Sequence, residues 1–598
     1  MDKNSIIAIV LSTLVLGGSL FYQTKYVLPK QKAQAEAQKQ AQAVAKSEIV
    51  EESTEKDSLV SIGKTSDNIP EENFVIETKK AKVTFTNKGG DIVSYKIFNT
   101  KENETEEIEM VTNVSEVNRA FALSLGNADN SIINEKFNVI KIDDYTIGFV
   151  KEFSRKDAEG NVKNFQVAKR YSFKEDDYLF KLDVSIDNGE SGDGFNINDA
   201  AYTLRTAPQI GPKINAKDKT DIRQYVSCNG TKKYRKPISD KVFNKKFTWA
   251  GVTGKYFSTL VYPVNANSMN QMVKSSTKNY GQSGNAQIYL TRKAFETNSV
   301  TDTYYVYIGP RHEKELIAYN NAEKNSWGLS GLNLNQAQQT SSLLWPIEIA
   351  LKWILEMLYK LAKNWGVAII LLTILIKIVL FPLNLKTATG SIKMQEIQPK
   401  VKNLQEKYKD NPTKLNEETM KLYKQVGYNP ASGCLPMIIQ MLIIFALYSV
   451  FNNYYEFRGA SFIKGWIDDL SIGDSIWSWE KKIPIISGFT QNNLRILPLV
   501  YTFSQLFNGK ITQYGGQTGG NQMQMNMMLY GMPIMFFFLF YNMASGLLLY
   551  WAVSNIIQIV QQLVINGIVK NKKAKLAANE LKVNTNELKF KGGKKKTR

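Results

Sequence analysis

The stretch "TILIKIVLFP", residues Thr373–Pro382, places one lysine inside an otherwise apolar run. The run extends from residue 365 to 385, which is long enough for a helix to cross a hydrocarbon core of about 30 Å. A cation at that depth costs roughly 2.5–3.5 kcal/mol on insertion scales. A membrane helix that carries Lys377 must therefore provide its ammonium group with water, a partner or a route to the surface.

Of these three solutions, the sequence favours water. The nearer end of the predicted helix, at Asn384, is about 10 Å away at 1.5 Å per residue. Helical side chains lean toward the helix N-terminus, which here is away from that end, so reaching the surface is awkward for Lys377. The apolar segments of the C-terminal half contain no Asp or Glu that could pair with it. We therefore expect a water-filled groove around this lysine.

The apolar segments predict how often the chain crosses the membrane. Residues 6–22 form a first span without a small-residue cleavage site directly after it, which indicates an uncleaved anchor. The C-terminal half contributes five further spans, two of them short: 365–384, 435–451, 494–508, 525–543 and 547–569. Six spans place both termini on the same side of the membrane.

Lysine-rich segments predict the orientation of these spans. Residues 386–429 carry nine lysines against five acidic residues, and residues 570–598 carry eleven basic residues against two acidic ones. Such segments stay in the cytoplasm. Lys25, Lys30 and Lys32 then lie on the outer side of the first span, against the rule, but the later asymmetry is much larger. Both termini are therefore predicted to be cytoplasmic.

The chain of 598 residues, with a net charge of +20 and a mean hydropathy of -0.27, combines two unlike halves. Between residues 71 and 330, short segments alternate apolar and polar residues, as in "FVIETKKAKVTFTNKGGDIVSYKIF", and this pattern predicts a β-sandwich. The predicted fold is a multi-domain membrane protein with these parts: an anchor (1–23), a flexible linker (24–70), the β-sandwich (71–330), an amphipathic interfacial helix (331–364), a five-helix transmembrane core (365–569) and a basic tail (570–598).

The segment 386–429 within the core has a helical pattern of its own. Met394, Ile397 and Val401 follow helical spacing, and Asn411-Pro412 marks a break with a helix-start signal. This pattern predicts two short amphipathic helices that form an antiparallel hairpin on the cytoplasmic side.

Catalytic and metal-binding functions find no support in the residues. The two cysteines, Cys228 and Cys434, lie on opposite sides of the predicted membrane and cannot pair. The single histidine, His312, excludes a multi-histidine metal site. A "GKT" at residues 63–65 lacks the first glycine of a phosphate-binding loop, where Ser58 stands. We therefore predict no enzyme, no cofactor and no metal.

Polar residues recur inside the predicted spans. Hydrocarbon offers these groups no partners, so they either bond one another between helices or line a wet cavity. Thr373 lies one helical turn before Lys377, and Ser554 lies one turn before Gln558. The candidate groove residues from this reasoning are Lys377, Thr373, Gln440, Ser504, Gln505, Ser554 and Gln558.

Four stretches, taken together, resemble the core of the YidC/Oxa/Alb membrane protein insertases. They are "NWGVAIILLTILIKIVLFPL", "MQEIQPKVKNLQEKY", "NPASGCLPMIIQMLIIFALY" and "SGLLLYWAVSNIIQIVQQ". Upstream, "VTFTNKGGDIVSYKI" and "FTWAGVTGKYFSTLVYP" resemble the large periplasmic domain of the Gram-negative YidC branch. The resemblance implies an insertase and folding chaperone of the inner membrane that works alone or beside the Sec translocon, with a groove open to cytoplasm and lipid and a β-sandwich in the periplasm.

The resemblance also assigns residues. The family's charged groove position matches Lys377, where most bacterial members have arginine, and the preceding threonine matches Thr373. The family's aromatic groove position matches Trp551, beside Tyr550, where many members have tyrosine. Lysine keeps the charge but lacks the planar fork of arginine that grips a carboxylate with two hydrogen bonds.

The expected partners are nascent inner-membrane proteins, the Sec translocon and the lipid bilayer, with no small-molecule substrate. The hairpin and the basic tail would bind ribosomal RNA, and the tail could equally bind anionic lipid. A transporter or channel is the alternative function, although repeated halves are not evident. A purely structural anchor for the β-sandwich would leave the polar faces of the spans unexplained. The tail residues expected to bind partners are Lys594, Lys595, Lys596 and Arg598.

Overall fold

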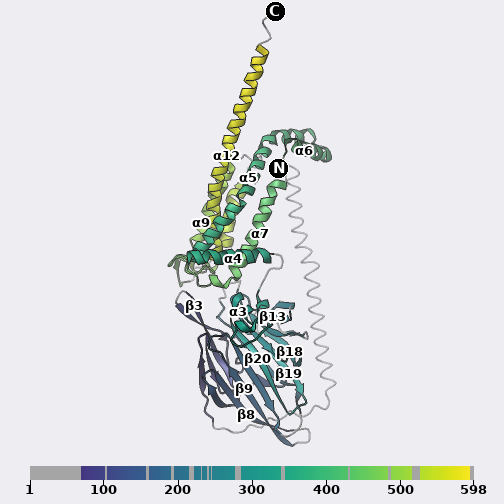
Figure 1. The fold of residues 1–598 in the computed structure, drawn as a ribbon, viewed down its shortest axis with the longest axis vertical. Coiled ribbons are helices and arrows are strands. Elements are labelled where there is room, and N and C mark those ends of the chain that lie inside the picture. The colour runs from purple at the N-terminus through teal and green to yellow at the C-terminus, as the bar shows by residue number, and fades with distance from the viewer. Residues whose placement is uncertain are drawn as a thin grey trace, which may run out of the picture.

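The computed structural model describes residues 69–592 except for short gaps at 102–103, 157–160, 190–193, 215–220, 231, 239–240, 244–245, 276–283, 339–343, 428–430, 482–485 and 515–525. The predicted anchor, nearly all of the linker and the tail residues Lys594, Lys595, Lys596 and Arg598 lie outside the described residues. The described chain has a β-rich N-terminal part and a helical C-terminal part (Figure 1).

The β-rich part, which we call the β-domain (residues 73–337), contains three main antiparallel sheets. The first has the order β1 (Asn73–Glu77), β2 (Ala81–Thr86), β3 (Asp91–Lys101) and β4 (Glu104–Glu109). The second has the order β14 (Lys232–Pro237), β13 (Gln224–Asn229), β16 (Trp249–Thr253), β17 (Phe257–Pro263), β20 (Ser299–Pro310), β10 (Leu179–Asp187), β9 (Val162–Ser172), β8 (Thr146–Lys156) and β7 (Asn138–Asp143). The third has the order β15 (Lys241–Phe243), β18 (Met269–Ser275), β19 (Ala286–Phe295), β11 (Phe195–Arg205) and β6 (Leu123–Leu125). A short pair joins β5 (Val111–Thr112) to β12 (Gln209–Ile210).

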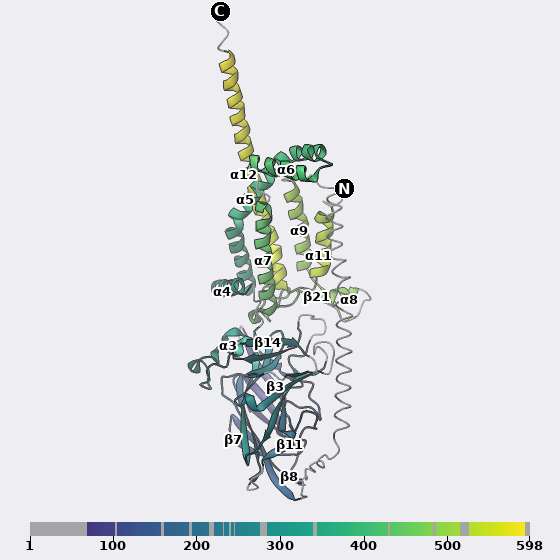
Figure 2. The ribbon, with the colours of Figure 1, turned by 90° about the vertical axis from the view of Figure 1, so that its right-hand side faces the viewer.

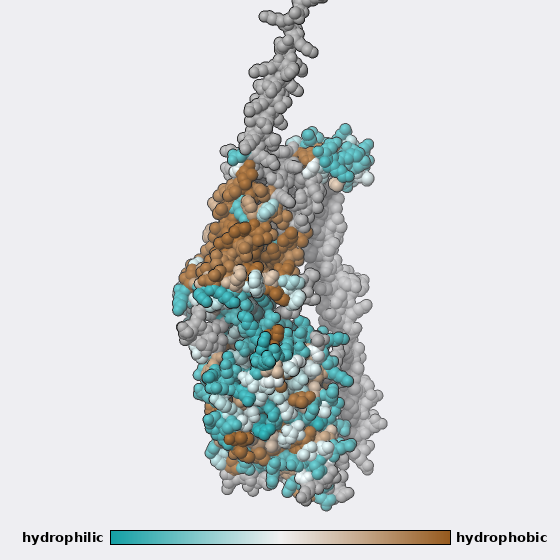
Figure 3. Space-filling view, in the orientation of Figure 1, coloured by the Kyte–Doolittle hydropathy of each residue, from teal (hydrophilic) through white to brown (hydrophobic). Residues whose placement is uncertain are grey.

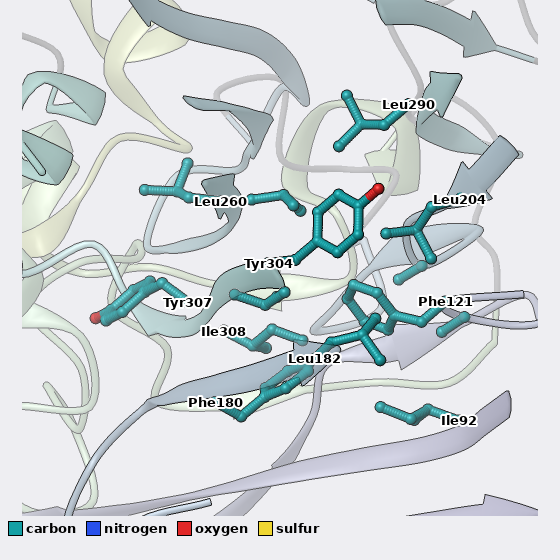
Figure 4. Close-up of a cluster of buried hydrophobic side chains, with 14 of the residues drawn as sticks. Ile92, Phe121, Phe180, Leu182, Leu204, Leu260, Leu290, Tyr304, Tyr307 and Ile308 are labelled. Atoms are coloured by element: carbon teal, nitrogen blue, oxygen red, sulfur yellow. The ribbon is translucent and has the colours of Figure 1, made fainter. Parts of the chain in front are cut away.

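One continuous core fills the β-domain, because apolar residues at every second position of a strand face the same side. Figure 4 shows part of it, where Tyr304 of β20 lies among leucines from the second sheet and from the third. Tyr304 is fully buried, and its hydroxyl group forms a hydrogen bond of 2.8 Å with the hydroxyl group of Tyr202. The predicted β-sandwich is therefore confirmed as a β-rich domain with its own core.

A charged cluster lies inside this core. Asp91 at the start of β3 is fully buried, and its carboxylate pairs with Lys169 Nζ at 2.5 Å and with Arg119 Nε at 2.9 Å. The ammonium group of Lys169 also donates to the carbonyl oxygens of Gly89 (3.1 Å) and Phe121 (2.8 Å). Burial lowers the pKa of Lys169, and the charge of Asp91 opposes that shift. The cluster links β3, β9 and the loop before β6.

Short helical elements close the β-domain after its last strand. They are α3 (Glu313–Ala318), η4 (Ala322–Lys324) and η5 (Leu334–Ala337), and a further turn, η3 (Ala266–Ser268), precedes β18. Leu334 and Ala337 are buried in the β-domain core. The β-domain therefore continues past the predicted boundary at residue 330, because apolar side chains after the last strand still pack on the sheets.

The helical part begins with α4 (Trp345–Ala362), which lies across the end of the other helices, next to the β-domain (Figure 1). Figure 2 shows the remaining helices on the other side of α4, most of them side by side, with α6 lying across their far end. They are α5 (Trp365–Lys407), α6 (Pro412–Val426), α7 (Ala431–Asn453), α9 (Leu497–Tyr514), η7 (Met527–Gly531), α11 (Met532–Phe540) and α12 (Ser545–Gly592).

The described helices differ in the length of their apolar stretches. Among the described residues, two stretches are long and apolar enough to cross a membrane, 365–385 and 545–568. Two shorter apolar helical stretches are 438–453 and 529–540. The expected third late span, 494–508, begins within β22, and its helix instead covers Leu497–Tyr514.

Two helices are much longer than the sequence predicts. α5 continues through Pro382 and Pro399 to Lys407, so the first helix of the expected hairpin is an extension of the helix that carries Lys377. α12 continues past the predicted end at residue 569 to Gly592. Proline inside a membrane helix is tolerated where neighbouring groups satisfy the freed carbonyl oxygens, and sequence rules treat it as a stop. The second hairpin helix, α6, begins after the Asn411 cap as expected.

The segment after α7 connects the two parts of the molecule. It includes η6 (Tyr455–Phe457), followed by β21 (Trp477–Ser478), α8 (Ile486–Thr490) and β22 (Asn493–Leu494). Tyr454 belongs to the apolar cluster of the helices, whereas Tyr455 is buried in the β-domain core beside Phe257 at a ring-centroid distance of 5.9 Å. Arg458 Nη1 and Nη2 bind the carboxylate of Glu106 at 2.7 and 3.0 Å.

Candidate functional site

Lys377 points into the bundle from α5. Its side chain is 5% exposed, and Nζ donates to Oε1 of Gln558 on α12 at 2.9 Å. A second amide of α12 meets the same turn of α5, because Nε2 of Gln561 donates to the carbonyl oxygen of Lys377 at 2.9 Å. Among the residues that the structure describes, no carboxylate pairs with this ammonium group. Within the described part of the chain, the amide oxygen of Gln558 is therefore the side-chain partner of the ammonium group, and Gln561 bonds the backbone of the same residue.

Thr373 and Lys377 lie on the inward face of α5, which follows from their spacing of four residues. Thr373 is fully buried, and its Oγ1 donates to the carbonyl oxygen of Ile369 at 2.7 Å. On the opposite face, Ile374 and Ile378 are 38% and 63% exposed. The hydroxyl group of Thr373 thus bonds its own helix and lies one turn from the ammonium group.

On α12, the residues predicted from the sequence differ in burial. Tyr550 and Ser554 are buried, and the hydroxyl group of Tyr550 has no hydrogen-bond partner within the described part of the chain. The half-buried Trp551 packs on Phe540 of α11 and Tyr501 of α9, at ring-centroid distances of 4.5 and 5.8 Å. Tyr550, Trp551, Ser554 and Gln558 follow one another along two turns of α12.

The residues of α9 and α7 complete the set. Ser504 accepts a hydrogen bond of 3.0 Å from Nδ2 of Asn555, which joins α9 to α12. Gln505 on α9 and Gln440 on α7 are half-buried. The described contacts bring Gln558, and not Gln440 or Gln505, to Lys377. Thr373 lies one turn before Lys377 on α5, Ser554 lies one turn before Gln558 on α12, and we call these four residues the cluster.

Two neighbours of the cluster were not among the predicted site residues. Gln561 contacts the backbone of Lys377, and Tyr501 contacts Trp551. Gln561 is a polar residue within an apolar segment, which is a signal available from the sequence. Tyr501 carries no such signal, because an aromatic residue in an apolar helix is ordinary.

The surface around this cluster is strongly apolar. Figure 3 shows a hydrophobic belt over the helices, between the hydrophilic α6 on one side and α4 with the β-domain on the other. A single ammonium group with amide and hydroxyl groups inside such a belt can attract an anion and exchange hydrogen bonds with a polar peptide. It holds no nucleophile activated by a base, so the cluster suits binding rather than covalent chemistry.

Two family models match most of the chain. "YidC periplasmic domain" covers residues 73–335, and "60Kd inner membrane protein" covers residues 357–573. The first match coincides with the β-domain, and the second covers the helices around Lys377.

Two relatives match almost the full length of the chain. The membrane protein insertase YidC of Treponema denticola is 44% identical, over 95% of this chain and 100% of its own length. That of Treponema pallidum is 37% identical, over 94% of this chain and 98% of its own length. A solved structure of an active YidC insertase with its first transmembrane domain matches 84% of this chain and 93% of its own, at 19% identity and a TM-score of 0.33. The chain therefore belongs to the YidC family of membrane protein insertases.

Proposed function

We propose that this chain inserts proteins into the inner membrane and helps them to fold, alone or beside the Sec translocon. The observation that carries the proposal is the buried ammonium group of Lys377 within an apolar helix bundle, whose partner among the described residues is the amide of Gln558 and not a carboxylate. An intramembrane cation without a carboxylate marks a path for polar or charged cargo. The relatives reported above are named insertases, which favours this function over a transporter or channel.

In the proposed topology, five helical segments of the C-terminal part cross the membrane: α5, α7, α9, η7 with α11, and α12. The hydrophobic belt in Figure 3 would lie in the bilayer, with α4 at its surface. The segment η7–α11 is short for a span, which suits a locally thinned bilayer. With the lysine-rich segments and both termini in the cytoplasm, the β-domain lies in the periplasm.

The physical task of an insertase is to move a short hydrophilic segment across a hydrocarbon layer. Each polar group that leaves water without a new partner costs roughly 1–3 kcal/mol, and a charge costs more. Hydroxyl and amide groups of Thr373, Ser554 and Gln558 would replace part of the lost hydration in a wet groove, and Gln440 would add to it after a small rearrangement of α7. The groove thus lowers the barrier without any covalent step.

Lys377 would give the path its preference for acidic segments. Its charge attracts a carboxylate from the cytoplasm into the groove. The membrane potential, negative inside, adds about 2.3 kcal/mol per charge per 100 mV in the direction of export for an anion. The apolar helix of the substrate then enters lipid beside Trp551 and Tyr550, and burial of its apolar surface makes release favourable.

The cytoplasmic face offers a second set of proposed contacts. The α5–α6 hairpin and the basic tail, which includes Lys594, Lys595, Lys596 and Arg598, would bind ribosomal RNA and keep the ribosome near the groove. Clustered lysines bind phosphate without sequence preference, so anionic lipid is the competing ligand for the tail. Binding of purified ribosomes by the full chain, compared with a chain that ends at residue 592, separates these ligands.

Gln558→Glu is expected to reduce insertion of proteins with short acidic tails about tenfold or more. The new carboxylate would lie where the amide oxygen now accepts from Lys377, at 2.9 Å, and would neutralise the charge that attracts the tail. Insertion into vesicles that contain the purified variant measures the effect. Gln562→Glu is the matched control, because Gln562 bonds Asn566 of its own helix at 2.9 Å. Equal insertion by the two variants would contradict the role given to Lys377.

Depletion tests the function as a whole. When the chain is removed from cells, the short acidic tails of newly made single-span proteins are expected to remain on the cytoplasmic side of the membrane. A protease added to the outer face, which digests only translocated tails, measures this. Unchanged translocation after depletion would refute the insertase function, whatever the role of Lys377.

A further inference from the structure

A cavity of about 270 Å³ lies where the β-domain meets the C-terminal end of α7. Its walls include Lys255 and Arg311 from the β-domain, and Tyr448, Asn452 and Asn453 from α7. Both charged residues among the described lining residues are cations, and no Asp or Glu lines the cavity. Lys377 is not among its lining residues, and Asn452 and Asn453 lie at the end of α7 that is opposite α6 (Figure 2).

Arg311 is the most unusual residue of this cavity. It is 3% exposed, yet within the described chain its Nε and Nη2 have no hydrogen-bond partner. Its backbone is fixed, because its N–H donates to Tyr256 at 2.6 Å and its carbonyl oxygen accepts from Nε2 of Gln338 at 2.5 Å. A buried guanidinium group normally fills its donors. The position of Arg311 is therefore held by the backbone, and it brings to the cavity wall a buried guanidinium group with two unfilled donors.

The neighbouring charges do not neutralise Arg311. Asp221, whose charge acts on Arg311, pairs with Arg223 at 2.5 Å and accepts the backbone N–H of Lys255 at 3.2 Å. Arg235 approaches as a second guanidinium group, and its Nη1 donates to Oε1 of Gln224 at 2.7 Å. Burial, helped by the charge of Arg235, lowers the pKa of Arg311 to about 9, which leaves it charged at neutral pH.

The end of α7 adds an opposing field along the cavity wall, beside that of the Asp221 carboxylate, which is paired with Arg223. Carbonyl groups at a helix C-terminus carry a partial charge of about −0.5. The two full cations, Lys255 and Arg311, outweigh it, so the potential of the cavity is positive. Such a cavity selects an anion, and guanidinium groups favour the oxygen atoms of phosphate.

The surface next to the cavity indicates what carries the anion. Met441, Phe445 and Tyr448 lie on one face of α7 at helical spacing, and they are 46%, 54% and 41% exposed. This apolar face leads along the helix to Tyr448, which lines the cavity. A positive cavity next to an apolar helix face matches the two parts of a phospholipid, an anionic head group and apolar acyl chains.

We propose that this cavity binds the phosphate group of an anionic phospholipid in the leaflet that faces the β-domain. The guanidinium group of Arg311 donates to the phosphate oxygens, the charge of Lys255 adds attraction, and the acyl chains lie against Met441, Phe445 and Tyr448. A bound lipid would thereby connect the β-domain to the end of α7.

Calorimetric titration of the full chain in a neutral detergent tests the proposal. The probes are dihexanoyl phosphatidylglycerol, below its critical micelle concentration, and inorganic phosphate. The wild-type chain is expected to bind the lipid, and Arg311→Gln is expected to weaken binding about tenfold or more through the loss of charge-assisted hydrogen bonds. Arg170→Gln, a change at a side chain 52% exposed on β9, is the control and is expected to bind as wild type.

A second variant tests the site independently, in case Arg311→Gln impairs folding. Asn452→Asp leaves Arg311 in place and introduces a carboxylate into the cavity, so it is expected to weaken lipid binding without lowering the melting temperature. Equal affinity of the wild-type chain and both variants would refute the site. Phosphate bound as tightly as the lipid would overturn the lipid assignment in favour of a soluble anion.

Discussion

Lys377→Glu is expected to reduce the insertion of proteins with short acidic tails about 100-fold or more. At roughly 6 Å and an effective dielectric constant of about 20, one charge pair is worth about 3 kcal/mol, and the substitution turns this attraction into repulsion. The side chain is buried beside Gln558, so water does not screen it as it screens a surface charge. Insertion per molecule of purified variant in vesicles measures the loss.

Two control variants separate charge from structure. Lys377→Arg keeps the cation and is expected to retain most of the activity. Lys324→Glu makes the same change of charge at an exposed position of the β-domain and is expected to insert as wild type. Full activity of Lys377→Glu at normal protein levels would show that the groove charge does not select the substrate.

Asp91→Ala is expected to lower the free energy of unfolding of the β-domain by about 3–5 kcal/mol. The variant leaves Lys169 and Arg119 buried without their carboxylate, and removing one partner of a buried pair has an effect of this size. The pKa of Lys169 should fall further, because the charge that opposes its burial is gone. Hydrogen exchange of the slowest amides of β3 and β9 in the full chain measures the change.

Glu77→Ala is the matched control for this cluster. Glu77 pairs with Lys82 at 2.9 Å between side chains that are 56% and 41% exposed. Loss of an exposed pair changes stability by about 1 kcal/mol or less. If Asp91→Ala destabilises the domain no more than Glu77→Ala does, the buried cluster is not the stabilising element described here.

The β-domain could be predicted from the sequence because its signals are local. Alternation of apolar residues requires only one strand, and Gly89 and Gly90 mark the turn before Asp91 because both have positive φ angles, 70° and 61°. The pairing of the strands could not be predicted. It brings β10 beside β20, which lie more than a hundred residues apart, through side chains that many other strands could also match.

The helices show where local signals mislead. Asn411 and Gly427 correctly mark the two ends of α6, because an N-cap side chain and a left-handed C-terminal residue each end a helix through contacts within one turn. Pro382 and Pro399 suggest breaks by general rules, yet both lie inside the continuous helix α5. The choice between a break and a continued helix depends on neighbours that the sequence does not specify.

The candidate site was predictable as a list of residues but not as an arrangement. Lysine, threonine and glutamine stand out in apolar segments, so Lys377, Thr373 and Gln558 were accessible from sequence. That Nζ of Lys377 meets Gln558 across 181 positions depends on how α5 packs against α12. Gln440 carries the same signal, yet its described contacts do not reach the lysine.

Water access to the inward face of α5 tests the central claim most directly. With Cys228 and Cys434 replaced, single cysteines at Thr373 and Lys377 on the inward face, and at Ile374 and Ile378 on the outward face, are exposed in membranes to a water-soluble maleimide. Maleimides react with the thiolate, which forms in water and not in hydrocarbon. We predict fast labelling at 373 and 377 and slow labelling at 374 and 378. Slow labelling at all four positions would mean that Lys377 lies in a dry bundle, and the proposed path for polar segments would fail.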